Sequence, residues 1–115
     1  MTHSMKLTPS PFAMIKDGQK TIELRLYDDK RRKIKIGDKI IFTNTETNET
    51  LEVEATGLYV FSSFEELYRE LPLLECGYTK DDIDSASPSD MNVYYSPEEQ
   101  SRYGVVGIRI AQSKQ

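Results

Sequence analysis

The chain has 115 residues, a formal net charge of −4 at pH 7, 37% hydrophobic residues and 30% charged residues. This length predicts one ordered domain over residues 1–115, with a single modest hydrophobic core and little room for a second. No apolar run approaches the roughly 20 residues of a membrane-spanning helix, and a lone cysteine excludes an internal disulfide, so we expect a cytoplasmic protein without membrane contact.

The chain begins with signals for a helix and a strand. Residues 9–18 predict a short helix that Ser10 caps and that Gly18 ends in the left-handed conformation. Residues 20–27 then alternate between apolar and polar side chains, which predicts a half-buried strand. Its apolar face would enter the core, and its outer face would carry the polar side chains of Thr21, Glu23, Arg25 and Tyr27.

Two further strands complete the first half. One is expected after the Gly37-Asp38 turn and another over residues 50–61, with a polar turn over residues 44–48 between them. Residues 5–7 are a candidate for a short additional strand before the first helix.

The second half is mostly helical. A capping box at Ser63 starts one helix, and a similar signal at Ser96 starts another that ends just before the last strand. Between them, residues 79–82 suggest a short helical turn and residues 85–92 read as a loop. Residues 104–111 form a closing strand whose alternate apolar side chains face the core.

This order of elements predicts the fold class. A helix, several short strands, a helical insertion and a closing strand favour an α+β fold, a small β-barrel with short flanking helices. An open α+β sheet is the competing architecture.

The charges are unevenly distributed along the chain. Residues 16–39 carry a net charge of +4, whereas residues 40–100 carry −12. Because a basic patch attracts an anionic partner, we expect phosphate contacts from the basic loop, which is composed of Arg31, Arg32, Lys33 and Lys35. A solvated loop that balances an acidic neighbour, or one that meets an acidic protein, is the alternative.

Most of the common catalytic residue sets are missing. His3 is the single histidine and is interpreted as a surface residue near a mobile terminus, and Cys76 as a buried bystander thiol. We therefore expect no metal site and no cofactor. The sequence leaves the oligomeric state open.

Lys20, Glu23 and Arg25 form the remaining cluster of chemical interest. Side chains two apart on a strand share a face, so Glu23 and Arg25 are neighbours. They could form an exposed ion pair worth about 0–1 kcal/mol. Alternatively, Arg25 holds Glu23 ionised in a pocket, ready to accept a proton, while Lys20 binds a phosphate or an oxyanion.

The stretch "GQKTIELR", Gly18 to Arg25, resembles the G-x-K-x-x-E-x-R signature of ASCH domains. The later stretches "IGDKIIF" and "YYSPEEQSRYGVVGIRI" are similar to the same family. The resemblance implies a PUA-like β-barrel with a cleft around Lys20, Glu23 and Arg25, and a role in binding or processing RNA. We therefore expect this cleft to bind RNA or a nucleotide. In such a protein Tyr94 and Tyr95 would stack on an unpaired base, although packing of a loop on the barrel is an equal alternative.

One branch of the resembled family removes the acetyl group from N4-acetylcytidine. Its nucleophile is a threonine three residues after the motif lysine, and here that position holds Glu23, with Thr21 nearby. The resemblance thus leaves a hydrolase of acylated nucleosides as an alternative, with Lys20 and Glu23 as its catalytic candidates. A non-catalytic protein-interaction domain is the third hypothesis.

Overall fold

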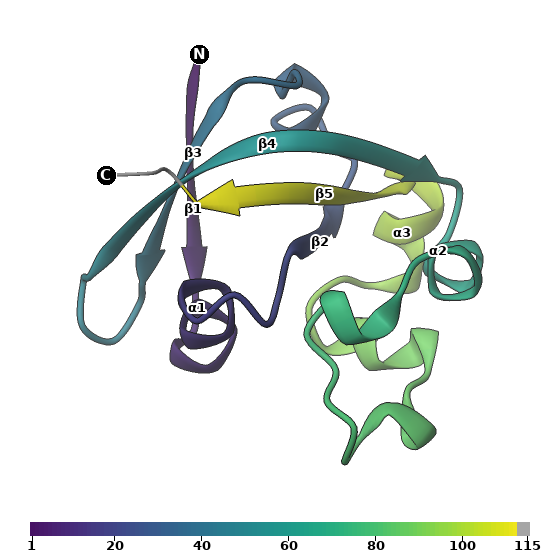
Figure 1. Ribbon diagram of the computed structural model, residues 1–115. Coiled ribbons are helices and arrows are strands. Elements are labelled where there is room, and N and C mark those ends of the chain that lie inside the picture. Colours follow the sequence, from purple (N-terminus) through teal and green to yellow (C-terminus); the bar gives the residue numbers. More distant parts are fainter. Residues whose placement is uncertain (113–115) are drawn as a thin grey trace.

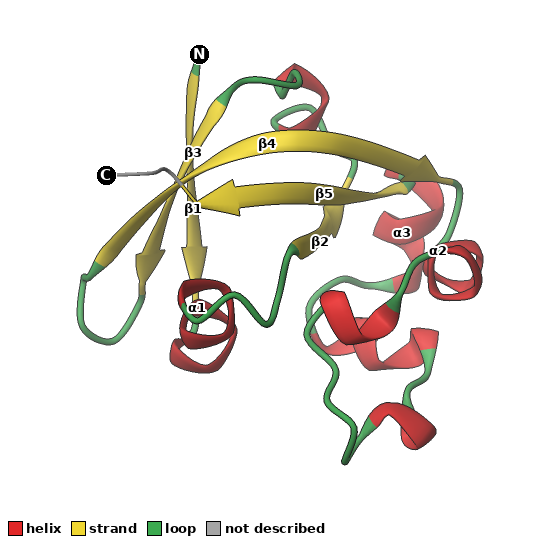
Figure 2. Ribbon diagram, in the orientation of Figure 1, coloured by secondary structure: helices red, strands yellow, loops and turns green. Residues whose placement is uncertain are grey.

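The structure is a computed structural model that describes residues 1–112 (Figure 1). Its centre is a five-stranded sheet that curls into half a barrel, with helices at one end and beneath it (Figures 1 and 2). The predicted α+β class is confirmed. The sheet has the order β1-β3-β4-β5-β2, with bounds β1 Thr2–Leu7, β2 Ile22–Leu26, β3 Lys39–Asn44, β4 Thr50–Phe61 and β5 Val105–Gln112.

Strand β4 produces much of the curl. It pairs with β3 through its first half and with β5 along most of its length, and all pairs are antiparallel except β1 with β3. The register shifts between Ala55 and Gly57, a bulge of the kind that bends a strand. A Cβ at Gly57 would lie 3.1 Å from the Tyr59 hydroxyl and 3.3 Å from Cβ of Arg109, so this crowded bend favours glycine.

Two hydrophobic cores flank the sheet, where the sequence predicted one. The first core lies between the curled sheet and α1 (Pro9–Lys16), and includes Phe12, Ile40, Phe42, Val53 and Ile108. The second core lies between the sheet and the helical segment, and includes Ile22, Leu24, Phe64, Leu67 and Val105. The apolar side chains of β2 all lie in this second core, and Glu23 on the opposite face is only 3% exposed, so the prediction of a half-buried strand is wrong for its outer face.

The two longer helices of the second half start where predicted, but the capping box predicted at Ser63 is incomplete, because the Glu66 carboxylate accepts from the Ser62 backbone N–H and not from that of Ser63. Helix α2 spans Phe64–Glu70, and the Ser63 hydroxyl accepts a hydrogen bond from the Glu66 backbone N–H. Helix α3 spans Pro97–Tyr103 and starts with a complete capping box from Ser96 and Glu99. At α1, by contrast, the N-cap is Thr8 and not Ser10, because Pro9 takes the first helical position.

Three further predictions need correction. Residues 85–92 are not a plain loop, since a 3-10 helix spans Pro88–Val93 with a capping box from Ser87 and Asp90. The candidate strand over residues 5–7 starts at Thr2. His3 consequently lies within β1, and its Nε2 is 2.8 Å from Oδ2 of Asp38, so it does not sit on a mobile end.

Among the described residues, no helix is both long and apolar enough to cross a membrane. Within the same part of the chain, no three His, Cys, Asp or Glu side chains gather as a metal ion would require.

Candidate functional site

A cavity of about 520 Å³ opens beside β2, one of the two strands at the ends of the sheet order. Strand β1 at the other end and helix α1 form part of its wall, and the segment from α2 to the Pro88–Val93 helix forms the rest. Its polar lining residues are Lys6, Thr8, Ser10, Lys20, Glu23, Arg25, Tyr68, Tyr78, Asp82, Asp90, Tyr94 and Tyr95. The three motif side chains thus share one cavity.

Glu23 joins the two motif cations into a buried ion triplet. The Lys20 ammonium lies 2.8 Å from Oε1 of Glu23, and the Arg25 Nε donates to Oε2 at 2.7 Å. The side chain of Glu23 is only 4% exposed, and those of Lys20 and Arg25 are 10% and 14% exposed. The alternative of an exposed ion pair is therefore wrong, because desolvation governs the energy of these charges.

The charge state of the triplet follows from its contacts. Burial alone would raise the pKa of Glu23, but the charges of Lys20 and Arg25 and their hydrogen bonds outweigh it and hold the pKa below its ordinary value. Burial would lower the pKa of Arg25, and the Glu23 carboxylate reverses this and raises it. Two cations and one carboxylate leave this wall with a net charge of +1 at neutral pH.

Backbone contacts fix the triplet in place. The backbone N–H of Lys20 donates to the Met14 carbonyl of α1, and that of Thr21 to the Glu75 carbonyl. Gly77 lies against the Lys20 side chain, since a Cβ there would be 3.5 Å from its Cδ. The Arg25 Nη2 donates to the Lys6 carbonyl at 2.9 Å, which links the two end strands of the sheet.

Thr21 does not replace the threonine nucleophile of the resembled branch. Its hydroxyl donates to Oε1 of Glu75 at 2.7 Å, a carboxylate that also binds Arg109, and Thr21 is not among the residues lining the cavity. Cys76 does line the cavity, but burial raises the pKa of its thiol to about 12. It stays protonated at neutral pH and is a poor nucleophile.

The two candidate tyrosines both lie at the cavity. Tyr95 stacks on Phe64, with ring centroids 6.3 Å apart and planes at 13°. Tyr94 is 67% exposed and its ring centroid is 6.4 Å from that of Tyr95. Tyr95 is therefore held by packing, whereas most of the Tyr94 side chain is exposed at the cavity.

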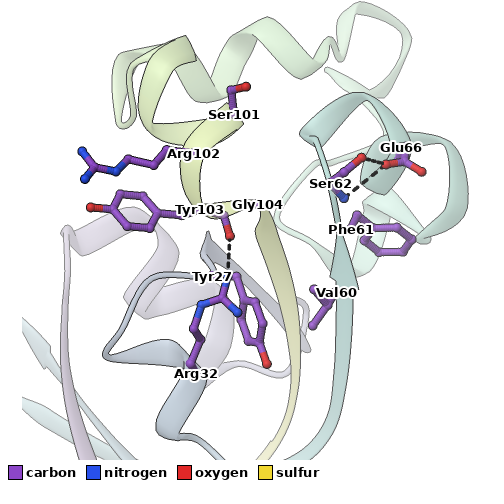
Figure 3. Close-up of a pocket in the computed structure, with 10 residues that line it drawn as sticks. All are labelled: Tyr27, Arg32, Val60, Phe61, Ser62, Glu66, Ser101, Arg102, Tyr103 and Gly104. Atoms are coloured by element: carbon purple, nitrogen blue, oxygen red, sulfur yellow. Dashed lines mark hydrogen bonds between the residues drawn. The ribbon is translucent and has the colours of Figure 1, made fainter.

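The structure does not bring the basic loop into the cavity. Arg31 pairs with Asp28 at 3.3 Å, and Lys33 and Lys35 are exposed. Arg32 belongs to a separate shallow groove of about 500 Å³, where its guanidinium lies 4.3 Å from the centroid of the Tyr27 ring and donates to the Tyr103 carbonyl at 3.0 Å (Figure 3). The four basic residues thus differ in their freedom to bind a partner.

Sequence reasoning missed one feature of the cavity, a hydrogen-bond chain of Tyr68, Tyr78 and Asp90. The Tyr78 hydroxyl donates to Oδ2 of Asp90 at 2.7 Å and lies 2.7 Å from the Tyr68 hydroxyl. Ser87 followed by Pro88, with Asp90 three residues after Ser87, is typical of a helix N-terminus and could have predicted the Pro88–Val93 helix. Nothing local, however, indicated that Asp90 meets Tyr78.

A profile of the ASCH domain matches residues 5–113 of this sequence. The chain belongs to the ASCH domain family. The earlier resemblance is thereby confirmed, and ASCH domains are PUA-like, in agreement with the curled sheet. The family is associated with RNA binding.

Solved structures agree with this assignment. The hypothetical protein PH0355 superposes on this ASCH domain with a TM-score of 0.82 and 36% identity, over 98% of this chain and 100% of that one. Protein PF0455 from Pyrococcus furiosus gives a TM-score of 0.76 and 31% identity over the full length of both. ASCH from Zymomonas mobilis shares the fold, with a TM-score of 0.64 and 13% identity over 95% of this chain and 66% of that one. No curated protein matches the chain significantly.

Proposed function

We propose that this ASCH domain binds RNA by taking one nucleotide into the cavity beside β2. The observation that carries the proposal is the buried triplet of Lys20, Glu23 and Arg25, which presents a net positive charge on a cavity wall. Buried cations with one shared counter-ion are well suited to an anionic ligand, because the ligand supplies the second negative charge.

The size and the lining of the cavity support the same ligand class. Its volume of about 520 Å³ lies within the range of roughly 300–1,000 Å³ that is usual for small-molecule pockets. The exposed Tyr94 ring offers a stacking surface for an unpaired base, with Tyr95 behind it. In this proposal Lys20 and Arg25 contact phosphate or base acceptors, and Glu23 positions both of them.

The basic loop has a secondary role in the proposal. Lys33 and Lys35 are exposed, so they attract RNA from a distance and contact its flanking phosphates. Arg31 and Arg32 already have partners in Asp28, Tyr27 and the Tyr103 carbonyl, and each would lose part of these contacts on binding RNA. We therefore expect smaller effects from the loop than from the cavity.

The geometry favours binding over hydrolysis by Glu23. Both of its carboxylate oxygens accept hydrogen bonds from cations, and its pKa is lowered, which makes it a weak general base at neutral pH. The matching position of the acetylcytidine branch holds a threonine, and Thr21 is bound to Glu75 instead.

A titration of labelled single-stranded RNA tests the proposal. Lys20→Ala should weaken binding by about ten-fold, since a charge-assisted hydrogen bond is lost. If that bond is to a phosphate, the slope of log affinity against log salt should fall by about 0.7. Lys39→Ala is the matched control, because Lys39 is an exposed lysine that pairs with Glu52 and does not line the cavity. Equal losses in both variants would mean that only total charge matters, and would refute a role for the cavity.

Product analysis by mass distinguishes binding from turnover. N4-acetylcytidine is incubated with wild type, Lys20→Ala and Glu23→Gln protein. The expected result is unchanged substrate in all three samples. Deacetylated product that disappears in both variants would overturn the binding proposal and make Lys20 and Glu23 catalytic.

A further inference from the structure

The chain of Tyr68, Tyr78 and Asp90 forms part of the cavity wall contributed by the helical segment. Its two hydrogen bonds are both 2.7 Å long, from the Tyr78 hydroxyl to Asp90 Oδ2 and between the two tyrosine hydroxyls. The ion triplet uses none of these groups. Gly77, which precedes Tyr78, lies beside the Lys20 side chain, since a Cβ there would be 3.5 Å from its Cδ, so the two polar walls meet at this point.

The direction of the chain is fixed by counting hydrogens. An ionised carboxylate only accepts hydrogen bonds, and Asp90 already accepts one from the Ser87 backbone N–H at 3.1 Å. Tyr78 therefore gives its one hydroxyl hydrogen to Asp90. Its oxygen can then only accept, so the hydrogen between the two tyrosines comes from Tyr68.

Tyr68 consequently has no hydrogen left for a ligand. Within the described residues its oxygen makes no other hydrogen bond, so it offers only lone pairs to the cavity. The group is also held in place. The Tyr68 ring makes edge contacts with Phe64 and Tyr78, at centroid distances of 6.4 and 5.8 Å, and Asp90 sits in the capping box of the Pro88–Val93 helix.

The two walls thus make opposite demands on a ligand. Lys20 and Arg25 have only donors, whereas Tyr68 offers only an acceptor. A ligand must therefore place an N–H or O–H toward Tyr68. A carbonyl oxygen at that point would face lone pairs and lose the hydrogen bonds that it makes to water.

We propose that Tyr68, oriented by Tyr78 and Asp90, makes the cavity prefer a nucleobase with an amino group over its keto counterpart. Cytosine is preferred to uracil and adenine to hypoxanthine, because each first member presents an N–H where the second presents a carbonyl oxygen. This inference rests on the proposed function, and it adds the class of base to it.

Paired nucleoside monophosphates test the preference by calorimetry. Wild-type protein should bind the cytidine nucleotide about ten-fold more tightly than the uridine nucleotide, and the adenosine nucleotide similarly more tightly than the inosine nucleotide. In Tyr68→Phe each affinity ratio should fall close to one, because the nucleotide with the amino group binds more weakly. In Tyr78→Phe each affinity ratio should also fall close to one, but because the keto nucleotide binds more tightly, since Tyr68 then has a hydrogen to donate.

The two variants thus lose the preference for different reasons: Tyr68→Phe binds the amino nucleotide more weakly, and Tyr78→Phe binds the keto nucleotide more tightly. Damage to the fold would instead weaken the binding of all nucleotides. Tyr59→Phe is the matched control, because Tyr59 bonds Arg109 outside the cavity, and both ratios should remain at the wild-type value. Thermal unfolding of each variant shows whether the fold is kept.

Two results would overturn the inference. Wild-type protein that binds both members of each pair equally would refute it and leave the proposed function standing. A preference for the amino nucleotide that is kept in the Tyr78→Phe variant would also refute the inference and leave the proposed function standing. Wild-type protein that binds none of the nucleotides refutes the inference together with the proposed function, and Lys20→Ala distinguishes true cavity binding from binding elsewhere.

Discussion

Replacing Glu23 by Gln removes the one negative charge that Lys20 and Arg25 share. Both cations would stay in side chains that are only 10% and 14% exposed, without a counter-ion. Breaking a buried ion pair on one side costs about 3–5 kcal/mol. Since these cations border a cavity that water can enter, we expect the lower end, about 3 kcal/mol.

This loss is large for a domain of this size. Small domains typically have unfolding free energies of about 5–15 kcal/mol, and about 3 kcal/mol corresponds to a fall in Tm of about 10 °C or more. Urea unfolding followed by circular dichroism measures the difference. The matched control is Glu52→Gln, whose lysine partner is 3.7 Å away and 59% exposed, with an expected cost of about 0–1 kcal/mol.

The pH dependence gives a second test of the same reasoning. The folded-state pKa of Glu23 is lowered, so its stabilisation is present above the unfolded-state value and is lost as pH falls through the folded value. The difference in unfolding free energy between wild type and Glu23→Gln should therefore become smaller as the pH is lowered. Losses of equal size in Glu23→Gln and Glu52→Gln at neutral pH would refute the idea that burial makes this triplet costly to break.

Three further predictions concern the surroundings of the site. Asp38 accepts hydrogen bonds from His3 and from the Lys35 backbone, which lower its pKa to about 2, so the stability difference between wild type and Asp38→Ala should be largest near neutral pH and vanish as pH falls toward 2. Urea unfolding over a pH series measures it, and a difference that does not vary with pH would contradict the assignment. The Cys76 thiol, with a pKa raised to about 12 from an ordinary 9, should have a thiolate fraction lower by on the order of 1,000-fold than in the unfolded chain, so iodoacetamide should alkylate native protein far more slowly. Comparable rates with and without denaturant would show that the thiol is not shielded. Gly77 has φ of +115° beside Lys20, so Gly77→Ala should cost about 1–3 kcal/mol in urea unfolding, and an unchanged midpoint would argue against a strained turn there.

The motif and the strands were accessible from the sequence because local patterns determine them. The alternation over residues 20–27 placed Glu23 and Arg25 on the face opposite Ile22 and Leu24, as the structure has them. The alternation could not show that this polar face would also be covered. Glu23 is enclosed by Lys20 and Arg25 at a cavity whose other wall comes from residues 68–95, more than 40 residues away, so the burial of Glu23 depends on tertiary packing.

The basic loop shows the opposite limit. Its charge is plain in the sequence, but the sequence does not say which of its side chains are free. Arg32 donates to the carbonyl of Tyr103, 71 residues later, and stacks on Tyr27. Arg31 pairs with Asp28. The net charge of residues 16–39 includes Asp28 but does not show which cation it pairs with. Net charge predicts attraction, whereas binding needs side chains without a closer partner.

The separation of charge along the chain finds a physical explanation in the cavity. The basic segment contributes Lys20 and Arg25, which present donors, and the acidic segment contributes Asp90, which turns Tyr78 and Tyr68 into acceptors toward the ligand. Two segments of opposite sign thus form two walls of opposite hydrogen-bonding character. Such a cavity can orient a ligand as well as attract it, because reversing the ligand would place donor against donor and acceptor against acceptor. In the proposed function, the local arrangement of donors and acceptors at this site matters more than the total charge, so the net negative charge of the chain does not conflict with an anionic partner.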